Sequence, residues 1–387
     1  MPTCVELFAG GGGASLGLQR AGFRSVRQVE WDPDACATLR AAGFEDVVEG
    51  DVRTVSFDGI GSIDLLWASP PCQAFSTSGK RFGALDDRNG WPWTLEAIDR
   101  LRQSGSGPTW VLCENVPGIL HHVDGCSREV DPTTCAGCYW ERAVITGFQE
   151  RYACVSWRVL DAADYGAPQC RHRVILAAGP SPFPWPKESH SALNLIYDKW
   201  VGTGYWVKHG MQRPSRGPTL ADSRHMGIRL AVSSGRPDVG KLPYVTVRDT
   251  LGLKYPIRHQ SPTAHTIQHL PDDVAPTILG KGTLYAERHI QKGSFNPHYH
   301  TEQPSGGVLD IFGDSEECED TSGVVDAVIE AKGRRRLTSA ECSALQGFPV
   351  GYPWQGLSTS QYKQVGNAVA PPVAEALGRA VLGALRG

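Results

Sequence analysis

Apolar and polar positions alternate in blocks along the first 180 residues, where short apolar stretches are separated by stretches of helical spacing. The apolar stretches have the length of buried strands, and they end in polar or turn-forming residues. They cover residues 3–9, 25–31, 63–68, 109–115 and 173–179. The helical patterns between them include residues 14–20 and 33–39. This alternation predicts an α/β fold, with a doubly wound parallel sheet and helices on both faces.

The pattern changes after about residue 180. Through residue 333 the chain is rich in Pro, Gly, Ser, His and Thr and loses regular periodicity, which predicts a smaller, loop-rich domain of short strands. Helical spacing then returns, and the last helix carries one apolar stripe, formed by Val373, Leu377, Val381 and Leu385. That stripe needs a partner surface, for which we expect the sheet. The sequence thus predicts a discontinuous first domain, residues 1–180 plus 334–387, and a second domain at 181–333.

Composition excludes some classes of protein. The chain has no apolar run of about eighteen residues and no basic-then-apolar N-terminus, so we expect neither a membrane span nor a secretory signal. Eleven cysteines, an odd number spread along 387 residues, are typical of reduced thiols in a cytosol. A net charge of −3 does not decide about nucleic acid, but residues 332–336 (KGRRR) form a basic cluster. That cluster is either a phosphate contact or a solvated surface run.

The first two predicted strands end in unusual residues, and ligands of such sheets bind outside the strands' carboxyl ends. After the first strand come four glycines, residues 10–13, which allow a tight turn and close approach of a ligand. The second strand ends in Glu30, eighteen residues after Gly12, near the spacing at which an acid binds a ribose hydroxyl. Trp31 can stack on adenine, and Asp51 can accept from its amino group. These features predict an adenosine-containing cofactor, either NAD or S-adenosylmethionine.

A cysteine and three charged residues follow the other strand ends. Cys72 comes directly after two prolines, which can neither continue a strand nor donate to a sheet, so we expect its thiol to be held rigidly. Glu114 leaves the next apolar run, where a carboxylate is suited to share or donate a proton. Arg171 and Arg173 are two residues apart and are predicted to share one face of a strand. This set indicates nucleophilic addition to an electron-poor ring.

Six motifs together resemble, in order, the motif series of the DNA (cytosine-5)-methyltransferases. They are ELFAGGGGASLGL, PPCQAFS, ENVPG, PQCRHR, RLTSAECSALQGFP and QYKQVGNAVAPPVAEALG. They cover both ends of the chain and leave the middle, about residues 181–332, without strong motifs. The chain departs from the family at Pro70, where many members have Phe or another apolar residue, and in a Cys/His-rich segment after ENVPG.

The resemblance implies an S-adenosylmethionine-dependent methyltransferase with a Rossmann-like sheet domain and a target-recognition domain at 181–333. It implies that the Cys72 thiolate attacks C6 of a flipped-out cytosine, whose C5 then takes the methyl group. Glu114 would hold N3 and the amino group, while Arg173, with Arg171 beside it, would bind the base carbonyl or nearby phosphates. The positions that match the family's cofactor-binding residues are Phe8, Gly10, Gly12, Glu30, Trp31, Asp51, Pro71, Asn367 and Val369.

The resemblance also sets the expected partners. We expect a monomer that acts on double-stranded DNA in the cytoplasm of a bacterium or a phage-infected host, with no membrane and no metal needed for methyl transfer. A restriction-system role, with a cognate endonuclease but no stable complex, stays open beside an orphan or phage-borne role. A non-catalytic DNA-binding relative is disfavoured by intact Cys72, Glu114 and Arg173, and a nicotinamide-dependent dehydrogenase leaves the Pro-Pro-Cys unexplained. Some family members methylate tRNA, but the long middle region favours DNA.

The Cys/His-rich segment, residues 121–140, allows two interpretations. Cys135 and Cys138 form a C-x-x-C, Cys126 lies nine residues before it, and His121 or His122 precedes them. We take Cys126, Cys135, Cys138 and His121 as the candidate ligands of a Cys₃His zinc site. A single C-x-x-C is half of a usual ligand set, so the sequence favours the other interpretation, a polar surface loop with reduced cysteines.

Overall fold

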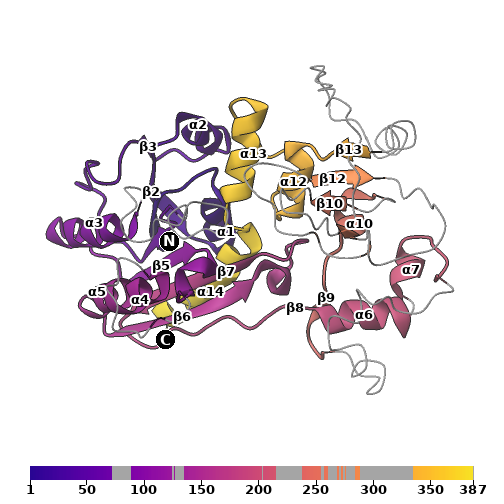
Figure 1. The fold of residues 1–387 in the computed structure, drawn as a ribbon. Helices are drawn as coiled ribbons and strands as arrows, with labels where there is room; N and C mark the ends of the chain where they lie inside the picture. The colour runs from indigo at the N-terminus through magenta and orange to yellow at the C-terminus, as the bar shows by residue number, and fades with distance from the viewer. Residues whose placement is uncertain are drawn as a thin grey trace.

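The computed structural model describes most of the chain outside the middle region (Figure 1). The described residues are 1–71, 89–123, 126, 135–202, 204–214, 238–253, 257–259, 268–269, 272, 275, 284–287 and 334–386. Cys72 lies outside this set, directly after the last described residue of its segment, Pro71. Most of the predicted recognition domain lies outside it too, as do Lys332 and Gly333 of the basic cluster.

A seven-stranded mixed sheet, in the order β3-β2-β1-β4-β5-β7-β6, forms the centre of the molecule. Its strands are β1 (Thr3–Leu7), β2 (Arg24–Glu30), β3 (Val47–Glu49), β4 (Leu65–Ala68), β5 (Trp110–Asn115), β6 (Cys154–Asp161) and β7 (His172–Gly179). The first five strands in this order pair in parallel, as the alternating pattern predicts. The order in which the chain adds strands reverses at β1: β2 and β3 lie on one side of it, and β4 and β5 lie on the other. The gap between β1 and β4 is therefore a topological switch point, where sheets of this kind bind ligands.

The prediction of a wholly parallel sheet is wrong for β7. This strand is antiparallel to both of its neighbours, β5 and β6. Strands β6 and β7 are consecutive and joined by ten residues, which is shorter than the crossover that a parallel pair needs. The reversal brings the start of β7 to the sheet edge at which β1, β4 and β5 end. Arg173 therefore still lies at the ligand edge, although from the opposite end of a strand.

Alternate residues of the central strands pack into two separate cores, because side chains of a strand point to opposite faces. Leu66 of β4 and Val111 of β5 face the core that also contains Ile98 of α3 (Trp91–Gln103). Trp67 and Leu112, their neighbours in the chain, face the core under α1 and α14.

Besides α3, the helices outside the middle region are α1 (Gly13–Ala21), α2 (Pro33–Ala41), α4 (Ala136–Tyr139), α5 (Thr146–Gln149), α12 (Ser339–Leu345), α13 (Ser358–Asn367) and α14 (Pro371–Arg386), with η2 (Pro117–Leu120), η3 (Trp140–Ile145) and η4 (Ala162–Tyr165), among the residues that the structure describes.

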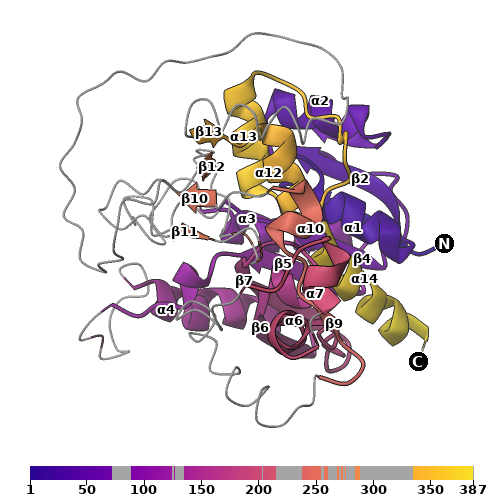
Figure 2. The same ribbon diagram turned by 90° about the vertical axis from the view of Figure 1, so that its right-hand side faces the viewer.

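The last helix returns to the first domain. In Figures 1 and 2, α14 runs alongside α1, and Val373, Leu377 and Val381 are buried in the core shared with β4 and β5. The predicted burial of the apolar stripe against the sheet is thus confirmed. An apolar window of eighteen residues within Ser358–Arg386 has the length and mean hydropathy, 1.3, of a membrane span by composition alone, yet half of that window is buried. The apolar face of α14 is accounted for by core packing.

The described parts of the middle region include helices, which the loss of periodicity did not predict. These helices are α6 (Ala192–Trp200), α7 (Gly204–Lys208) and α10 (Val247–Leu251). Short strands, as predicted, form two small sheets: β8 (His190–Ser191) with β9 (Leu242–Pro243), and β11 (Gln268–His269), β10 (Ile257–His259), β12 (Leu284–Glu287) and β13 (Arg334–Arg336) in that order. Since β13 pairs with β12, the middle sheet includes the first residues of the predicted C-terminal segment. The domain boundaries themselves stay a prediction.

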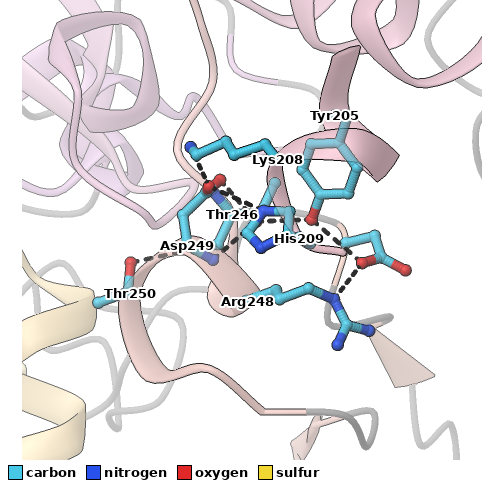
Figure 3. A network of polar contacts seen from close by, with 8 residues as sticks. Tyr205, Lys208, His209, Thr246, Arg248, Asp249 and Thr250 are labelled. Atoms are coloured by element: carbon cyan, nitrogen blue, oxygen red, sulfur yellow. Dashed lines mark hydrogen bonds and ion pairs between the residues drawn. The ribbon is translucent and has the colours of Figure 1, made fainter. Parts of the chain in front are cut away.

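A polar network joins α7 to α10 (Figure 3). Thr246 caps α10 by accepting from the Asp249 N–H, and the Asp249 carboxylate accepts from the Thr246 N–H, which completes a capping box. The same carboxylate lies 2.5 Å from Lys208 Nζ and 3.1 Å from His209 Nε2, both at the end of α7. Tyr205 Oη lies 3.0 Å from Thr246 Oγ1. Because α10 also packs against α12, this network connects the middle region to the C-terminal segment.

Candidate active site

One cavity of about 380 Å³ lies at the carboxyl edge of the sheet, beside the switch point between β1 and β4. It is walled by the residues that follow β1, β2, β3, β4 and β5, by the start of β7 and by the segment between α13 and α14. Among the sequence-predicted residues it is lined by Phe8, Gly10, Glu30, Trp31, Asp51, Pro71, Glu114, Arg171, Arg173, Asn367 and Val369. Gly12 is outside this lining, at the N-cap of α1. The cavity therefore combines nearly all of the described candidates.

The glycine loop after β1 uses its glycines for two different reasons. Gly10 and Gly12 have φ values of 56° and 88°, in the left-handed region that favours glycine. Gly11 and Gly13 are approached closely: a Cβ would lie 2.4 Å from the Trp354 ring at Gly11 and 2.1 Å from the Val369 carbonyl oxygen at Gly13. A Cβ at Gly10 would meet none of the described atoms within 4 Å. The backbone at Gly10 is thus open to the cavity.

Glu30, at the end of β2, is fixed by the backbone around it. Its Oε2 accepts from the Gly10 N–H at 2.7 Å, and its Oε1 accepts from the N–H groups of Trp31 and Asp32 at 2.9 and 2.8 Å. Burial raises the pKa of this carboxyl, and the three backbone donors oppose the shift. A carboxylate can accept about four hydrogen bonds, so acceptor capacity remains toward the cavity. The neighbouring Trp31 side chain is 71% exposed although it is a large aromatic ring.

Asp51 follows β3 and is held by an arginine. Both of its carboxylate oxygens lie 3.0 Å from Arg53 Nε, and Oδ2 also lies 2.5 Å from Nη2. The Arg53 guanidinium in turn lies 4.6 Å from the ring centroid of Trp93, on α3. Hydrogen bonding to Arg53 is the main cause that lowers the pKa of Asp51, and burial opposes it. Asp51 is therefore an oriented, ionised carboxylate in the cavity wall.

The two prolines before Cys72 are positioned by the neighbouring strand and helix. Asn115, the last residue of β5, donates through Nδ2 to the Pro70 carbonyl at 3.1 Å and accepts from the Val116 N–H at 2.9 Å. At Gly90, before α3, a Cβ would lie 2.7 Å from Pro71 Cδ and 2.9 Å from Pro70 Cβ. Pro71 lines the cavity, so the chain is directed into the site immediately before Cys72.

Glu114 and Arg173 form an ion pair in the wall of the cavity. Arg173 Nε lies 2.7 Å from Glu114 Oε1, and the two side chains are 16% and 9% exposed. The pairing follows from the register of β7 beside β5, in which Asn115 is opposite Val174. Burial strengthens such a pair, because little solvent screens the two charges. The carboxylate and the guanidinium are thereby presented together to any base that enters the cavity.

Arg171 lies beside this pair but has a different environment. Its side chain is buried, and Nη2 donates to the Gly366 carbonyl of α13 at 2.9 Å. The backbone N–H groups of Cys170 and Ala275 bond to the Ala275 and Pro168 carbonyls, so a piece of the middle region is paired with this segment. Arg171 therefore joins the start of β7 to the C-terminal segment that supplies Asn367 and Val369.

The sequence did not single out Glu6, which also lines the cavity. It points to the α1 side of the sheet and accepts a hydrogen bond from Ser15. Burial raises the pKa of its carboxyl to about 8. An acid inside the apolar run of β1 was the available signal, since carboxylates are rarely buried without a specific partner. Lys363 of α13, also in the lining, lies 2.9 Å from Asp32 at the N-cap of α2.

Two other sequence predictions change. Cys126, Cys135 and Cys138 gather with His122, not with His121, because the chain leaves η2 with the side chain of His122 toward the sulfurs. Cys135 and Cys138 are buried, so the expectation of a polar surface loop is wrong for this pair.

In the basic cluster, Arg335 forms an ion pair with Glu341 through two nitrogens, and the Arg336 guanidinium stacks on the Tyr362 ring at 4.0 Å. These two guanidinium groups serve the fold.

Comparison with known proteins places this chain among methyltransferases. A model of the C-5 cytosine-specific DNA methylase family matches residues 2–196 and 254–383. The type II methyltransferase M.NgoMIV of Neisseria gonorrhoeae is 28% identical over 99% of this chain and 98% of its own length. M.HpaII of Haemophilus parainfluenzae is 26% identical over 98% of this chain and 89% of its own length.

Solved structures share the fold. The Dnmt2 methyltransferase of S. pombe aligns with a TM-score of 0.58 at 17% identity, covering 100% of both chains. The methyltransferase EhMeth of Entamoeba histolytica aligns with a TM-score of 0.52 at 17% identity, covering 100% of this chain and 99% of its own. The seven-stranded sheet and its helices are therefore the Rossmann-like fold of this group, as the sequence predicts.

Proposed function

This chain belongs to the family of C-5 cytosine-specific DNA methylases and is a DNA cytosine-5 methyltransferase; we propose that it takes the methyl group from S-adenosylmethionine and works through a covalent bond between Cys72 and cytosine C6. One observation carries the proposal. A single cavity is lined both by Glu30 and Trp31, which suit an adenosine, and by the Glu114–Arg173 pair, which suits a cytosine. Cofactor and base would thus meet in one place.

The cavity fits the cofactor in its chemistry. Glu30 has acceptor capacity left for the ribose hydroxyls, and the exposed Trp31 ring offers a face for the adenine. Asp51, oriented by Arg53, would accept from the adenine amino group. The open backbone at Gly10 leaves room where a side chain would intrude. When bound, this cofactor supplies an electrophilic methyl group on a sulfonium.

Glu114 and Arg173 would hold the target base. Glu114 would accept from the cytosine amino group through one oxygen and, when protonated, donate to N3 through the other. Arg173 would bind the base carbonyl through its guanidinium, which the Glu114 contact orients. The hydrogen bond that Glu114 donates to N3 and the contact of Arg173 with the base carbonyl both draw electron density out of the ring, which makes C6 more electrophilic. The base must first leave the duplex, which costs a few kcal/mol.

Cys72 would supply the nucleophile, since a thiolate is reactive near neutral pH. Its sulfur forms a bond to C6, and the C5–C6 electron pair moves to C5. C5 would then take the electrophilic methyl group that the cofactor supplies, and the bond from that carbon to the cofactor's sulfonium sulfur would break. A base removes the C5 proton, the electrons of that C–H bond restore the C5–C6 double bond, and Cys72 leaves as thiolate. Pro70 and Pro71, fixed by Asn115 and Gly90, would limit the positions open to this thiol.

The relatives' names extend the proposal to a biological role. M.NgoMIV and M.HpaII are type II methyltransferases, so we propose that this chain modifies a specific sequence of double-stranded DNA for a type II restriction system. It would act as a monomer in the bacterial cytoplasm, where its DNA is.

Bisulfite sequencing of plasmid DNA from cells that express the chain tests the proposal. We expect one short sequence to be methylated at one cytosine throughout the plasmid. Glu114→Gln should lower methylation at least about 100-fold, because it removes the ion pair and the proton donor together. Glu150→Gln, which changes a 66% exposed glutamate after α5, is the matched control and should keep full activity. Unmethylated plasmid from soluble wild-type protein would refute the proposed activity.

A further inference from the structure

Four side chains that methyl transfer does not use meet after η2. His122 and Cys126 come from the segment that leaves η2, and Cys135 and Cys138 lie at the N-cap and inside α4. Their ligand atoms all lie within 4.8 Å of one another. Cys126 Sγ is 3.3 Å from Cys138 Sγ, and His122 Nδ1 is 3.5 Å from Cys135 Sγ and 3.6 Å from Cys138 Sγ.

These distances have the size of a tetrahedral metal site. A zinc ion bound at about 2.3 Å to sulfur and about 2.0 Å to nitrogen puts neighbouring ligand atoms roughly 3.5 to 3.8 Å apart. A disulfide would need two sulfurs about 2.05 Å apart, so the Cys126–Cys138 separation of 3.3 Å does not describe one. Three thiolates with one imidazole in this geometry are the ligand set of structural zinc.

The histidine is oriented as a ligand should be. Its Nδ1 faces the sulfurs, and its Nε2 lies 3.5 Å from Glu141 Oε1 on the other side of the ring. A carboxylate on the far nitrogen keeps the proton there and leaves the Nδ1 lone pair for a metal, which is the usual partner of a metal-bound histidine. His121, one residue earlier, is not in the cluster.

Gly137, between Cys135 and Cys138, makes room for this arrangement. A Cβ there would lie 2.6 Å from both Cδ2 and Nε2 of His122. Any side chain at this position would displace the imidazole from this arrangement. The backbone around it is ordered by hydrogen bonds from the Gly137 N–H to the His121 carbonyl and from the Tyr139 N–H to the Cys135 carbonyl.

We propose that His122, Cys126, Cys135 and Cys138 bind one structural Zn²⁺ ion. Cys135 and Cys138 are 1% and 0% exposed, and the protein supplies all four ligands, which is typical of a structural rather than a catalytic site. The ion cross-links the end of η2 to α4 across the seventeen residues from His122 to Cys138, which have few apolar side chains of their own.

The cross-link supports the wall of the active site. Tyr139, next to Cys138, accepts from Asn89 Nδ2 at 2.8 Å, and Trp140 packs edge-on against Trp91 at 5.5 Å. Asn89 and Trp91 flank Gly90, which packs on Pro70 and Pro71. Loss of the ion is therefore expected to loosen the segment that leads to Cys72 as well as α4 itself.

Metal analysis of the full-length chain, purified under reducing conditions without chelator from zinc-supplemented cells, tests this site. We expect about one zinc per chain, lost by at least about 10-fold in Cys135→Ser and in His122→Ala. Two matched controls, His121→Ala and Cys154→Ser on β6, should keep the metal. Wild-type protein with little zinc, or equal zinc in all four variants, would overturn the proposal.

A second measurement decides the matter if the ligand variants are insoluble. Wild-type protein grown with Co²⁺ in place of Zn²⁺ should show the intense thiolate-to-cobalt absorption of a tetrahedral thiolate-rich site, and added Zn²⁺ should remove it. Only the weak absorption of octahedral Co²⁺, or a Cys126–Cys138 disulfide found by mass spectrometry in protein purified without reductant or metal loss, would contradict a zinc site.

Discussion

At the scale of single residues, the cavity is organised by carboxylates whose surroundings differ. Glu30 is surrounded by backbone N–H donors, Asp51 is paired with Arg53, Glu114 is paired with Arg173, and Glu6 is buried next to Ser15. These environments suit, in turn, a carboxylate that accepts from hydroxyls, one that accepts from an amine, one that holds a base and one that stays protonated in the core. The sequence named Glu30 and Glu114 from their positions at the ends of apolar runs, and Asp51 from the short motif GDV at residues 50–52. It did not name Glu6, although an acid inside the apolar run of β1 was visible, because the sequence alone does not show that this side chain is buried.

Glu30→Ala should weaken binding of S-adenosylmethionine by about 2 to 3 kcal/mol, or roughly 30- to 150-fold. The variant removes a charged acceptor and leaves the N–H groups of Gly10, Trp31 and Asp32 without it. Calorimetric titration measures the affinity, and Glu49→Ala on the exposed end of β3 serves as control. Equal affinity in Glu30→Ala and wild type would remove Glu30 from the cofactor site.

Glu6 predicts a pH dependence of stability. Its pKa in the folded chain is about 8, above the ordinary value of 4.5, so the folded state keeps a proton that the unfolded state releases between these values. The free energy of unfolding then falls as pH rises from about 4.5 to about 8. Glu6→Gln cannot ionise, so at pH 8.5 its stability relative to wild type should exceed the pH 5 difference by on the order of 4 kcal/mol.

Urea denaturation of both proteins at pH 5 and pH 8.5 measures this difference. Glu49→Gln, which changes an exposed carboxylate, should behave like wild type at both pH values. A stability difference between Glu6→Gln and wild type that is the same at both pH values would show that Glu6 is ionised throughout.

At the scale of elements, the site depends on close contact between the two ends of the chain. Gly13 and Gly17 of α1 lie against the segment 369–375, so that the glycine loop and the cofactor-lining Val369 are held together. The sequence predicted α1, α14 and the apolar stripe correctly, because each has a clear period of 3.6 residues. It could not predict that β7 is antiparallel, because the apolar part of this strand has no feature that differs between a parallel and an antiparallel strand.

Gly17→Ala and Gly383→Ala make the same change in two helices and should have opposite effects. At Gly17 a Cβ would lie 2.4 Å from the Pro371 carbonyl oxygen and 2.5 Å from Ala374 Cβ, so the helices must separate, at a cost of about 1 to 3 kcal/mol. At Gly383 a Cβ would meet none of the described atoms within 4 Å, and alanine should stabilise α14 by up to about 1 kcal/mol. Thermal unfolding should give a lower Tm for the first and an equal or higher Tm for the second; a Gly17→Ala protein as stable as Gly383→Ala would refute the close packing.

At the scale of the whole molecule, the fold and the location of the site follow from strand ends that converge on one edge, and these could be read from order and spacing. The identity of the fourth Cys-cluster residue could not, because His121 and His122 are adjacent and only the path of the backbone after η2 distinguishes them. The role of Arg335 and Arg336 could not be read either, since their partners, Glu341 and Tyr362, are set by tertiary packing.

The choice of DNA sequence should belong to the middle region, residues 181–333. Replacing that segment by its counterpart from a relative with a different target should transfer the relative's specificity, because we assign no sequence-specific DNA contacts to the catalytic part of the chain. The replaced segment would have to keep its contacts with the catalytic part, which are made through α10 and β13. Bisulfite sequencing of plasmid DNA reads the outcome. Continued methylation of the original site would place recognition elsewhere in the chain.

The central claim is that Cys72 forms a covalent bond to the target cytosine, and trapping on fluorinated DNA tests it most directly. A duplex with 5-fluorocytosine at the methylated position cannot lose a proton from C5, so the adduct should accumulate when S-adenosylmethionine is present. Digestion and mass spectrometry should then find the nucleotide on the peptide that contains Cys72, and Cys72→Ser should form no adduct while Cys154→Ser still does. An adduct on any other residue, or none with an enzyme that methylates the unmodified duplex, would contradict this mechanism.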